Sequence, residues 1–223
     1  MNELRINSIE SFSTKDGDGI RSVVFLQGCN LRCDYCHNPE TWDMKGGEAF
    51  SVADLADKVL RFKDYWGVDG GVTISGGEPL LQAKALIGFI EFLKRHDVNV
   101  ALDTSGSVIN DDVRDVISLC DKIILDIKNP GELAFLDEAE KSCKRVWIRI
   151  VIVPGVNDTV EAADKYAKVL KGRNVEKVEL VPFHTLGFDK YEKLGIENPL
   201  VNTKGCSVSV VKELQRRFDS ICK

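Results

Sequence analysis

The sequence predicts an α/β protein in which six strands alternate with helices, and three observations lead to this fold class. Runs of β-branched and other apolar residues recur along the chain, helix-like segments separate them, and polar or glycine-rich residues follow them. With 223 residues, 43% of them hydrophobic, the chain can bury roughly 70% of its extended surface in one core. Near-continuous apolar strands joined by helices favour parallel pairing, with both faces of the sheet covered.

The expected strands are short apolar runs. They cover residues 21–27, 71–75, 98–103, 122–127, 146–153 and 177–181. Periodicity alone leaves two arrangements open, an open barrel and a flat, doubly wound sheet. Because no linker or sharp change of composition divides the chain, we expect a single domain over residues 1–223.

The expected helices lie between these strands. Val52, Leu55 and Ala56 follow helical spacing, and Ser51 with Asp54 can cap the first turn. Further helices are expected around residues 89–93 and 113–120, and over residues 132–142, 160–170 and 208–221.

Composition and charge exclude several classes of function. The formal net charge of −5 argues against broad attraction to nucleic acid or to an anionic membrane. No stretch approaches the roughly 18 uncharged apolar residues of a membrane span, so we expect a cytoplasmic protein. Seven cysteines cannot all pair within one chain, and in a reducing compartment clustered cysteines are more often metal ligands or catalysts than disulfides.

Polar and glycine-rich residues follow the strands at the edge where parallel α/β folds carry their chemistry. Cys29 follows the first strand, and Gly76, Gly77 and Glu78 follow the second. The later strands contribute Asp103 and Thr104, then Asp126, Ile127 and Lys128, then Arg149 within the fifth strand and His184 after the sixth.

The cysteine loop is the strongest local signal. Cys29, Cys33 and Cys36 form a C-x3-C-x2-C spacing, and three thiolates this close can bind a cubane iron–sulfur cluster that normally takes four. One iron then stays open to a substrate or cofactor. A structural zinc site completed by His37 is the alternative, since three cysteines and one histidine are an ordinary zinc ligand set. The other four cysteines are expected to be packing or surface residues, with Cys120 and Cys143 on apolar helix faces.

The cysteine loop and the Gly76-Gly77-Glu78 segment together resemble the radical S-adenosylmethionine (SAM) superfamily. Longer strings are similar to one branch of it, the pyruvate formate-lyase activating enzymes, over about Ile9 to His184. They are Asp16-Gly17-Asp18-Gly19-Ile20-Arg21, Gln27-Gly28-Cys29, Tyr35-Cys36-His37-Asn38-Pro39, Thr41-Trp42-Asp43, Val146-Trp147-Ile148-Arg149 and Val153-Pro154-Gly155. The resemblance implies a partial (β/α)6 barrel of the radical SAM type.

The resemblance also implies the chemistry. Cys29, Cys33 and Cys36 would hold a [4Fe-4S] cluster whose fourth iron binds SAM, and an electron from the cluster would break SAM into methionine and a 5′-deoxyadenosyl radical. That radical would take a hydrogen atom from a glycine of a partner glycyl-radical enzyme. By the same resemblance, Lys128 is expected to be catalytic together with the three cysteines.

The remaining expected site residues bind SAM or a cation. By the resemblance, SAM contacts are expected from Tyr35, Cys36, His37, Gly76, Gly77, Glu78, Asp126, Ile127, Lys128, Arg149 and His184. A structural ion pair is an equal alternative for Arg149. Asp103 and Asp126, with Thr104 and the Ile124 carbonyl, are expected to hold Na+ or K+, and hydrogen bonds to backbone amides or to Lys128 are the alternative.

The expected partners are a pyruvate formate-lyase-like enzyme and a reduced flavodoxin- or ferredoxin-like electron donor, with the chain itself a monomer. Alternatives are an activator of anaerobic ribonucleotide reductase, a small-molecule radical SAM enzyme, and a non-enzymatic zinc- or cluster-binding module. Two features depart from the family pattern. Asp18 stands where proline is common, and only 17 residues separate Lys128 from Val146, which predicts a trimmed helix or loop.

Overall fold

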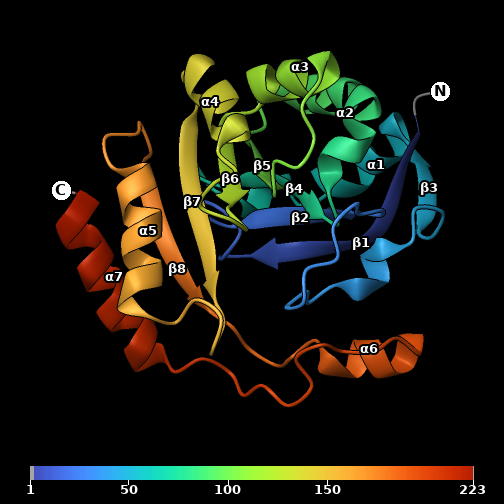
Figure 1. Ribbon diagram of the computed structural model, residues 1–223. Coiled ribbons are helices and arrows are strands. Elements are labelled where there is room, and N and C mark those ends of the chain that lie inside the picture. Colours follow the sequence, from blue (N-terminus) through green and yellow to red (C-terminus); the bar gives the residue numbers. More distant parts are fainter. Residues whose placement is uncertain (1–2, 223) are drawn as a thin grey trace.

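The computed structural model describes residues 3–222, which form an eight-stranded sheet in the order β3-β1-β2-β4-β5-β6-β7-β8 (Figure 1). Six strands run parallel to one another and correspond to the six expected runs. They are β2 (Arg21–Leu26), β4 (Gly71–Gly76), β5 (Val100–Thr104), β6 (Lys122–Asp126), β7 (Arg145–Ile152) and β8 (Lys177–Pro182). The prediction of a parallel α/β architecture is therefore confirmed.

Two further strands, β1 (Glu3–Ser13) and β3 (Glu48–Ser51), were not expected from the sequence. β1 pairs antiparallel with both β2 and β3 and so extends the parallel sheet at one edge. Most residues of β1 alternate between exposed and partly buried positions, with only Leu4, Ile6 and Ser13 buried. A strand of this kind lacks the continuous apolar run that marks a parallel strand covered on both faces.

The helices alternate with the strands as expected. They are α1 (Val52–Leu60), α2 (Ala83–Arg95), α3 (Asp111–Leu119), α4 (Ala134–Lys141), α5 (Val160–Leu170) and α7 (Val208–Cys222), together with the short helix α6 (Phe188–Leu194). Three 3-10 turns complete the fold, namely η1 (Pro39–Trp42), η2 (Lys63–Tyr65) and η3 (Pro79–Gln82). The short connection between Lys128 and Val146 still contains a helix, α4, which links β6 to β7.

Side-chain caps fix where several helices begin. Ser51 accepts a hydrogen bond from the Asp54 amide at the start of α1, as its spacing predicted. Asn110 and Thr159 play the same part for α3 and α5. Each cap satisfies an amide that the first helical turn leaves without a partner.

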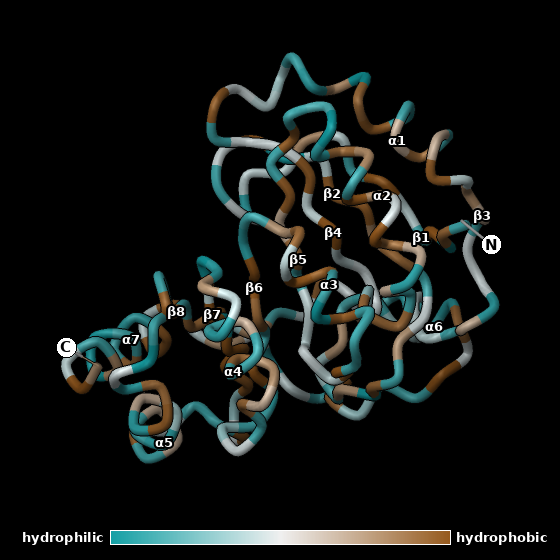
Figure 2. Tube along the Cα trace, turned by 90° about the horizontal axis from the view of Figure 1, so that it is seen from above, coloured by the Kyte–Doolittle hydropathy of each residue, from teal (hydrophilic) through white to brown (hydrophobic). Residues whose placement is uncertain are grey.

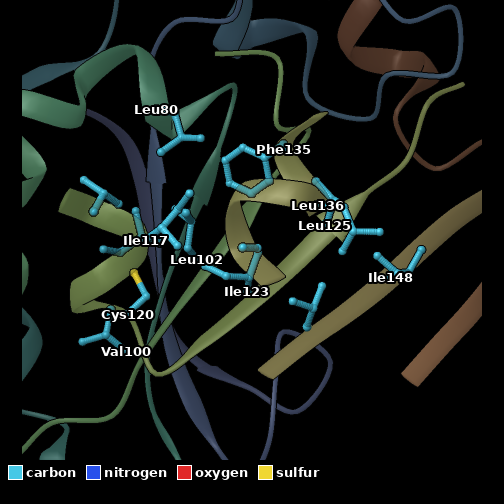
Figure 3. Packing of buried hydrophobic residues seen from close by; sticks show 14 of the residues in the cluster. Leu80, Val100, Leu102, Ile117, Cys120, Ile123, Leu125, Phe135, Leu136 and Ile148 are labelled. Atoms are coloured by element: carbon cyan, nitrogen blue, oxygen red, sulfur yellow. The ribbon is translucent and has the colours of Figure 1, made fainter. Parts of the chain in front are cut away.

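The main apolar core lies between the sheet and the helices that cover it. Along β7 the residues alternate, so that Val146, Ile148 and Ile150 are buried in this core while the residues between them are partly exposed. Figure 3 shows the packing of β5, β6 and β7 against α3 and α4, with Leu102, Ile123 and Phe135 among the labelled residues. The polar face of the strands is left free to line a site.

The cysteines outside the cluster loop follow the prediction only in part. Cys120 is 1% exposed and packs among apolar side chains (Figure 3). Cys143 is exposed and has a φ of 53°, so its placement on an apolar helix face was wrong. It follows α4 in a left-handed turn, which helical periodicity does not indicate.

The helix α6 stands apart from the other helices. In Figure 1 it lies below the sheet, while α5 and α7 lie together beside β8. Figure 2 shows α5 and α7 with both hydrophilic and hydrophobic residues along their lengths, as expected of helices with one buried face. None of the helices within residues 3–222 is long and apolar enough to cross a membrane.

Candidate active site

The cysteine loop lies at the carboxyl ends of the parallel strands, directly after β2. Cys29, Cys33 and Cys36 line one cavity of about 260 Å³, to which the ends of β4, β5 and β6 also contribute. Of the other expected residues, Tyr35, His37, Gly76, Gly77, Asp103, Thr104, Asp126 and Lys128 line the same cavity. Most of the predicted site is thus brought together in space.

Hydrogen bonds within and beside the loop give it a defined path. The Gly28 amide donates to the Thr41 carbonyl at 2.8 Å, and the Cys36 amide donates to the Cys33 carbonyl at 3.1 Å. Arg32 donates from one guanidinium nitrogen to the Cys29 carbonyl at 2.8 Å and to the Leu31 carbonyl at 2.7 Å. The loop is therefore shaped by polar contacts, since it has no helix or strand of its own.

The three loop thiols are partly buried, and burial raises the pKa of Cys29, Cys33 and Cys36. An isolated thiol in this position stays protonated at neutral pH, whereas a metal ligand is a thiolate. Ligation by a cation would therefore release protons from these side chains.

The geometry around His37 does not favour the zinc alternative. Its Nε2 lies 2.9 Å from the His184 carbonyl oxygen, and the two imidazole rings stack with centroids 3.8 Å apart. Among residues 3–222, no three histidine, cysteine or acidic side chains converge closely enough to hold a single metal ion. A cubane cluster takes each cysteine at a different iron, so it does not require the three sulfurs to meet at one point.

Gly76 and Gly77 allow the end of β4 to lie directly against the cysteine loop. A Cβ at Gly76, where φ is 121°, would lie 2.2 Å from the Leu26 amide nitrogen. A Cβ at Gly77 would lie 2.2 Å from the Gly28 carbonyl oxygen. The immediate need for glycine is thus the close approach of the two backbones, which also opens the cavity wall to a ligand.

Glu78 lies beneath the cavity, is fully buried and does not line it. One carboxylate oxygen accepts from the Thr104 hydroxyl at 2.6 Å and the Leu80 amide at 3.1 Å. The other accepts from the amide and the hydroxyl of Ser105 at 3.0 and 2.5 Å. Glu78 therefore ties the loop after β4 to the end of β5.

Lys128 and Asp126 form an ion pair on the cavity wall, with 2.5 Å between Nζ and Oδ2. Burial by itself lowers the pKa of Lys128, but the charge of Asp126 and then of Tyr35 outweighs burial and raises it overall. The Lys128 ammonium also lies 5.1 Å from the centre of the Tyr35 ring. The second oxygen of Asp126, Oδ1, is buried without a hydrogen-bond partner.

Asp103 lies deeper in the cavity wall, where burial raises its pKa to about 6 despite the opposing effect of Arg149. Its Oδ2 accepts from the Ser75 hydroxyl at 3.0 Å and lies 3.7 Å from Arg149 Nη1. Arg149 itself does not line the cavity. It donates to the Lys15 carbonyl and lies 3.9 Å from Asp16, so its contacts are those of a structural ion-pair network.

Three other expected residues also lie outside the cavity lining. His184 is exposed and stacks on His37, Ile124 is buried, and the Ile127 side chain belongs to the apolar core. Six residues that line it were not expected as site residues, namely Leu31, Asn38, Thr41, Ser75, Ser105 and Val151. Polar Thr73 and Ser75 alternate with apolar residues in β4, and this alternation was an available signal for Ser75.

Asp18 belongs to the segment that joins β1 to β2. Its carboxylate accepts from Lys122 at 2.5 Å and lies 3.4 Å from Arg145, at the start of β6 and β7. Burial raises the pKa of Asp18, but the positive charges of Lys122 and Arg145 lower it by more, so the pKa lies below its usual value. The departure from proline at this position thus supplies a counter-charge for the buried Lys122.

Comparisons with known proteins agree with the site. A family model described as a 4Fe-4S single cluster domain matches residues 15–141, which include the cysteine loop. The pyruvate formate-lyase-activating enzyme of Clostridium pasteurianum is 42% identical over 228 residues, which cover 95% of each chain. That of Streptococcus mutans is 40% identical and covers 89% of this chain and 84% of the relative.

The chain belongs to the pyruvate formate-lyase-activating enzyme family.

This family is a radical SAM enzyme family, so the enzyme class expected from the cysteine loop is confirmed. The fold is confirmed as well. A radical SAM methyltransferase from Sphaerobacter thermophilus superposes with a TM-score of 0.64 at 17% identity, over 90% of this chain and 64% of that one. Periodicity alone left an open barrel and a flat, doubly wound sheet as alternatives, and the fold shared with radical SAM proteins is the partial barrel.

Proposed function

We propose that this protein uses a [4Fe-4S] cluster and SAM to place a radical on a glycine of pyruvate formate-lyase. The observation that carries the proposal is the set of three loop cysteines lining one cavity at the strand ends, in a chain of this family. Three ligands leave one iron of a cubane without a protein ligand, which is where SAM would bind.

The residues present fit such a ligand pair. Three thiols border the cavity, the glycine backbone of Gly76 and Gly77 forms one wall, and Asp126 offers a buried oxygen without a partner. When bound, the cluster and SAM supply one-electron cleavage of SAM to methionine and a 5′-deoxyadenosyl radical, which takes a hydrogen atom from glycine.

In this proposal the chain's own residues bind and orient. Tyr35, His37, Gly76 and Gly77 contact SAM, and the Lys128–Asp126 pair presents both charges to its polar groups. Glu78 acts from below by fixing the β4 and β5 loops, rather than by contact.

The more distant residues take different parts. His184 reaches the ligand beside His37, against which it stacks. Ile127 contributes its backbone, because its side chain is in the core. Arg149 orients Asp103 and the segment after β1.

A monovalent cation, Na+ or K+, is the second component we propose. Asp103, Thr104, the Ile124 carbonyl and Asp126 would hold it, and the unpartnered Asp126 Oδ1 supports this assignment. The Thr104 hydroxyl donates to Glu78 and accepts from the Gly106 amide, which leaves one lone pair for a cation. A neighbouring Lys128 competes for the same carboxylate, so the cation would be weakly held.

We further propose that the protein works as a single-domain monomer in the cytoplasm and takes its electron from a reduced flavodoxin- or ferredoxin-like protein. A loop near the surface suits delivery of an electron by a docked protein, since the three cysteines are only partly buried.

The test is anaerobic reconstitution with iron and sulfide, followed by reductant and SAM. The wild-type chain should hold about four irons and release 5′-deoxyadenosine. Cys33→Ala should lose both properties, while Cys143→Ala, at an exposed cysteine, should keep them. One equivalent of zinc without iron, or an iron-loaded chain that leaves SAM intact, would overturn the proposal.

A further inference from the structure

The helix α6 is carried away from the helices that cover the sheet. It spans seven residues, Phe188–Leu194, in the connection between β8 and α7, and it packs against η1 immediately after the cysteine loop (Figure 1). We call residues 185–194 the α6 arm. A helix this short is marginal by itself, so its place depends on what it contacts.

The closest polar contact joins Tyr191 to the third cysteine. The Tyr191 hydroxyl donates to the Cys36 carbonyl oxygen at 3.0 Å. The Tyr191 side chain is 2% exposed, and its ring meets Trp42 edge-on with centroids 5.9 Å apart. A buried hydroxyl needs a partner, and here the partner is the backbone of a proposed iron ligand.

Two further contacts attach the arm to the residues that follow Cys36. Lys190 donates to Asn38 Oδ1 at 2.9 Å and to Glu40 Oε1 at 2.5 Å. A Cβ at Gly187 would lie 2.8 Å from the His37 carbonyl oxygen, so only glycine allows the arm to approach this closely. The arm therefore contacts the chain at Cys36, His37, Asn38 and Glu40.

The two ends of the cysteine loop are held from different sides. Arg32, within the loop, bonds the Cys29 carbonyl, whereas the Cys36 carbonyl is bonded by the arm. The Cys36 carbonyl and side chain are joined through one Cα, so a hydrogen bond that holds the carbonyl also limits movement of the side chain. The donor hydroxyl is on a buried ring, which holds it in place.

We propose that Tyr191 is a positioning residue, which orients Cys36 so that it holds its iron in register with Cys29 and Cys33. This inference rests on the proposed function, because it takes Cys36 as a cluster ligand. In this proposal the α6 arm affects how firmly the cluster is held and its electronic environment. The arm does not contact SAM or the partner.

The variant that isolates the hydrogen bond is Tyr191→Phe, which keeps the ring and its packing on Trp42. We expect the reconstituted variant to release iron to a chelator roughly two- to tenfold faster than wild type, the effect of one lost hydrogen bond. The electron paramagnetic resonance (EPR) g-values of the reduced cluster should shift as well. Gly187→Ala, which pushes the arm off His37, should act in the same direction.

Tyr65→Phe is the matched control, since Tyr65 is 61% exposed and lies on η2. It should leave iron release and the EPR spectrum unchanged. Suppose that the wild-type chain cleaves SAM, while Tyr191→Phe releases iron at the wild-type rate and has an unchanged spectrum. That result would overturn this inference alone. The inference would also be overturned if Tyr191→Phe lowered the unfolding free energy of the metal-free protein as much as that of the cluster-loaded protein, because the effect would then be one of folding. A wild-type chain that takes up no iron would overturn the proposed function together with it.

Discussion

Replacement of Glu78 by glutamine should destabilise the metal-free chain, although the two side chains have the same shape. Glu78 is fully buried and accepts four hydrogen bonds, from Leu80, from Thr104 and two from Ser105. All four donors face a carboxylate that can only accept while ionised. A side chain at this position therefore has to accept hydrogen bonds, and a donor group placed here would face other donors.

The magnitude follows from the contacts that glutamine cannot reproduce. Its amide oxygen can still accept from Leu80 and Thr104, but its amino group faces the Ser105 amide, which is also a donor. A hydrogen bond to a charged group contributes about 1.5–3 kcal/mol. Removal of a buried charge offsets part of this loss, and the Ser105 hydroxyl can turn to accept. We therefore expect the free energy of unfolding to fall by about 1–3 kcal/mol.

Urea unfolding of the metal-free protein, followed by circular dichroism, measures this difference. The control is Glu91→Gln on the exposed face of α2, which should change the unfolding free energy by less than about 0.5 kcal/mol. If Glu78→Gln is as stable as wild type at pH 7, the four hydrogen bonds do not favour a carboxylate over an amide, and the reasoning is refuted.

Three other substitutions test the framework around the site. Gly77→Ala should lower the unfolding free energy by about 2 kcal/mol or more, because its Cβ would lie 2.2 Å from the Gly28 carbonyl, and a wild-type urea midpoint would contradict that packing. Arg21→Met should lower the unfolding free energy by about 1–3 kcal/mol, because Arg21 is 1% exposed and donates to the Thr73 hydroxyl and the Val72 carbonyl. Wild-type stability would show that these hydrogen bonds are not needed. Burial raises the pKa of Asp103 to about 6, above its unfolded value near 3.8, so the native state binds more protons between these values. Asp103 should therefore contribute stability that falls as pH rises from about 4 to 6, by at most about 3 kcal/mol, so the wild-type profile should fall relative to that of Asp103→Asn. A wild-type profile that rises relative to that of Asp103→Asn across this window would contradict the assignment.

The parallel strands and the cysteine loop could be predicted because their signals are dense and local. Each parallel strand is an apolar run covered on both faces, and Cys29, Cys33 and Cys36 lie within one short segment. β1 could not be predicted in this way, since its residues alternate with little burial. Its pairing depends on β2 and β3, which are separate in sequence.

The parts of the site that escaped prediction depend on long-range contacts. Tyr191 meets Cys36 across 155 positions of sequence, and a seven-residue helix carries too little periodicity to mark its buried face. Arg149 was ambiguous because strand register decides whether its side chain turns toward the cavity or toward Asp16. The glycines were expected to approach a ligand, but their tightest neighbours are the backbone atoms of Leu26 and Gly28.

The central claim is that this cavity produces a radical that is passed to a protein glycine. The most direct measurement is EPR spectroscopy of anaerobic mixtures of the reconstituted chain, SAM, reductant and pyruvate formate-lyase. We predict a doublet from a glycyl radical on the pyruvate formate-lyase, absent with Cys33→Ala and absent when SAM is omitted. A cluster-loaded chain that cleaves SAM but gives no doublet on this partner, or gives one only on an anaerobic ribonucleotide reductase, would contradict it.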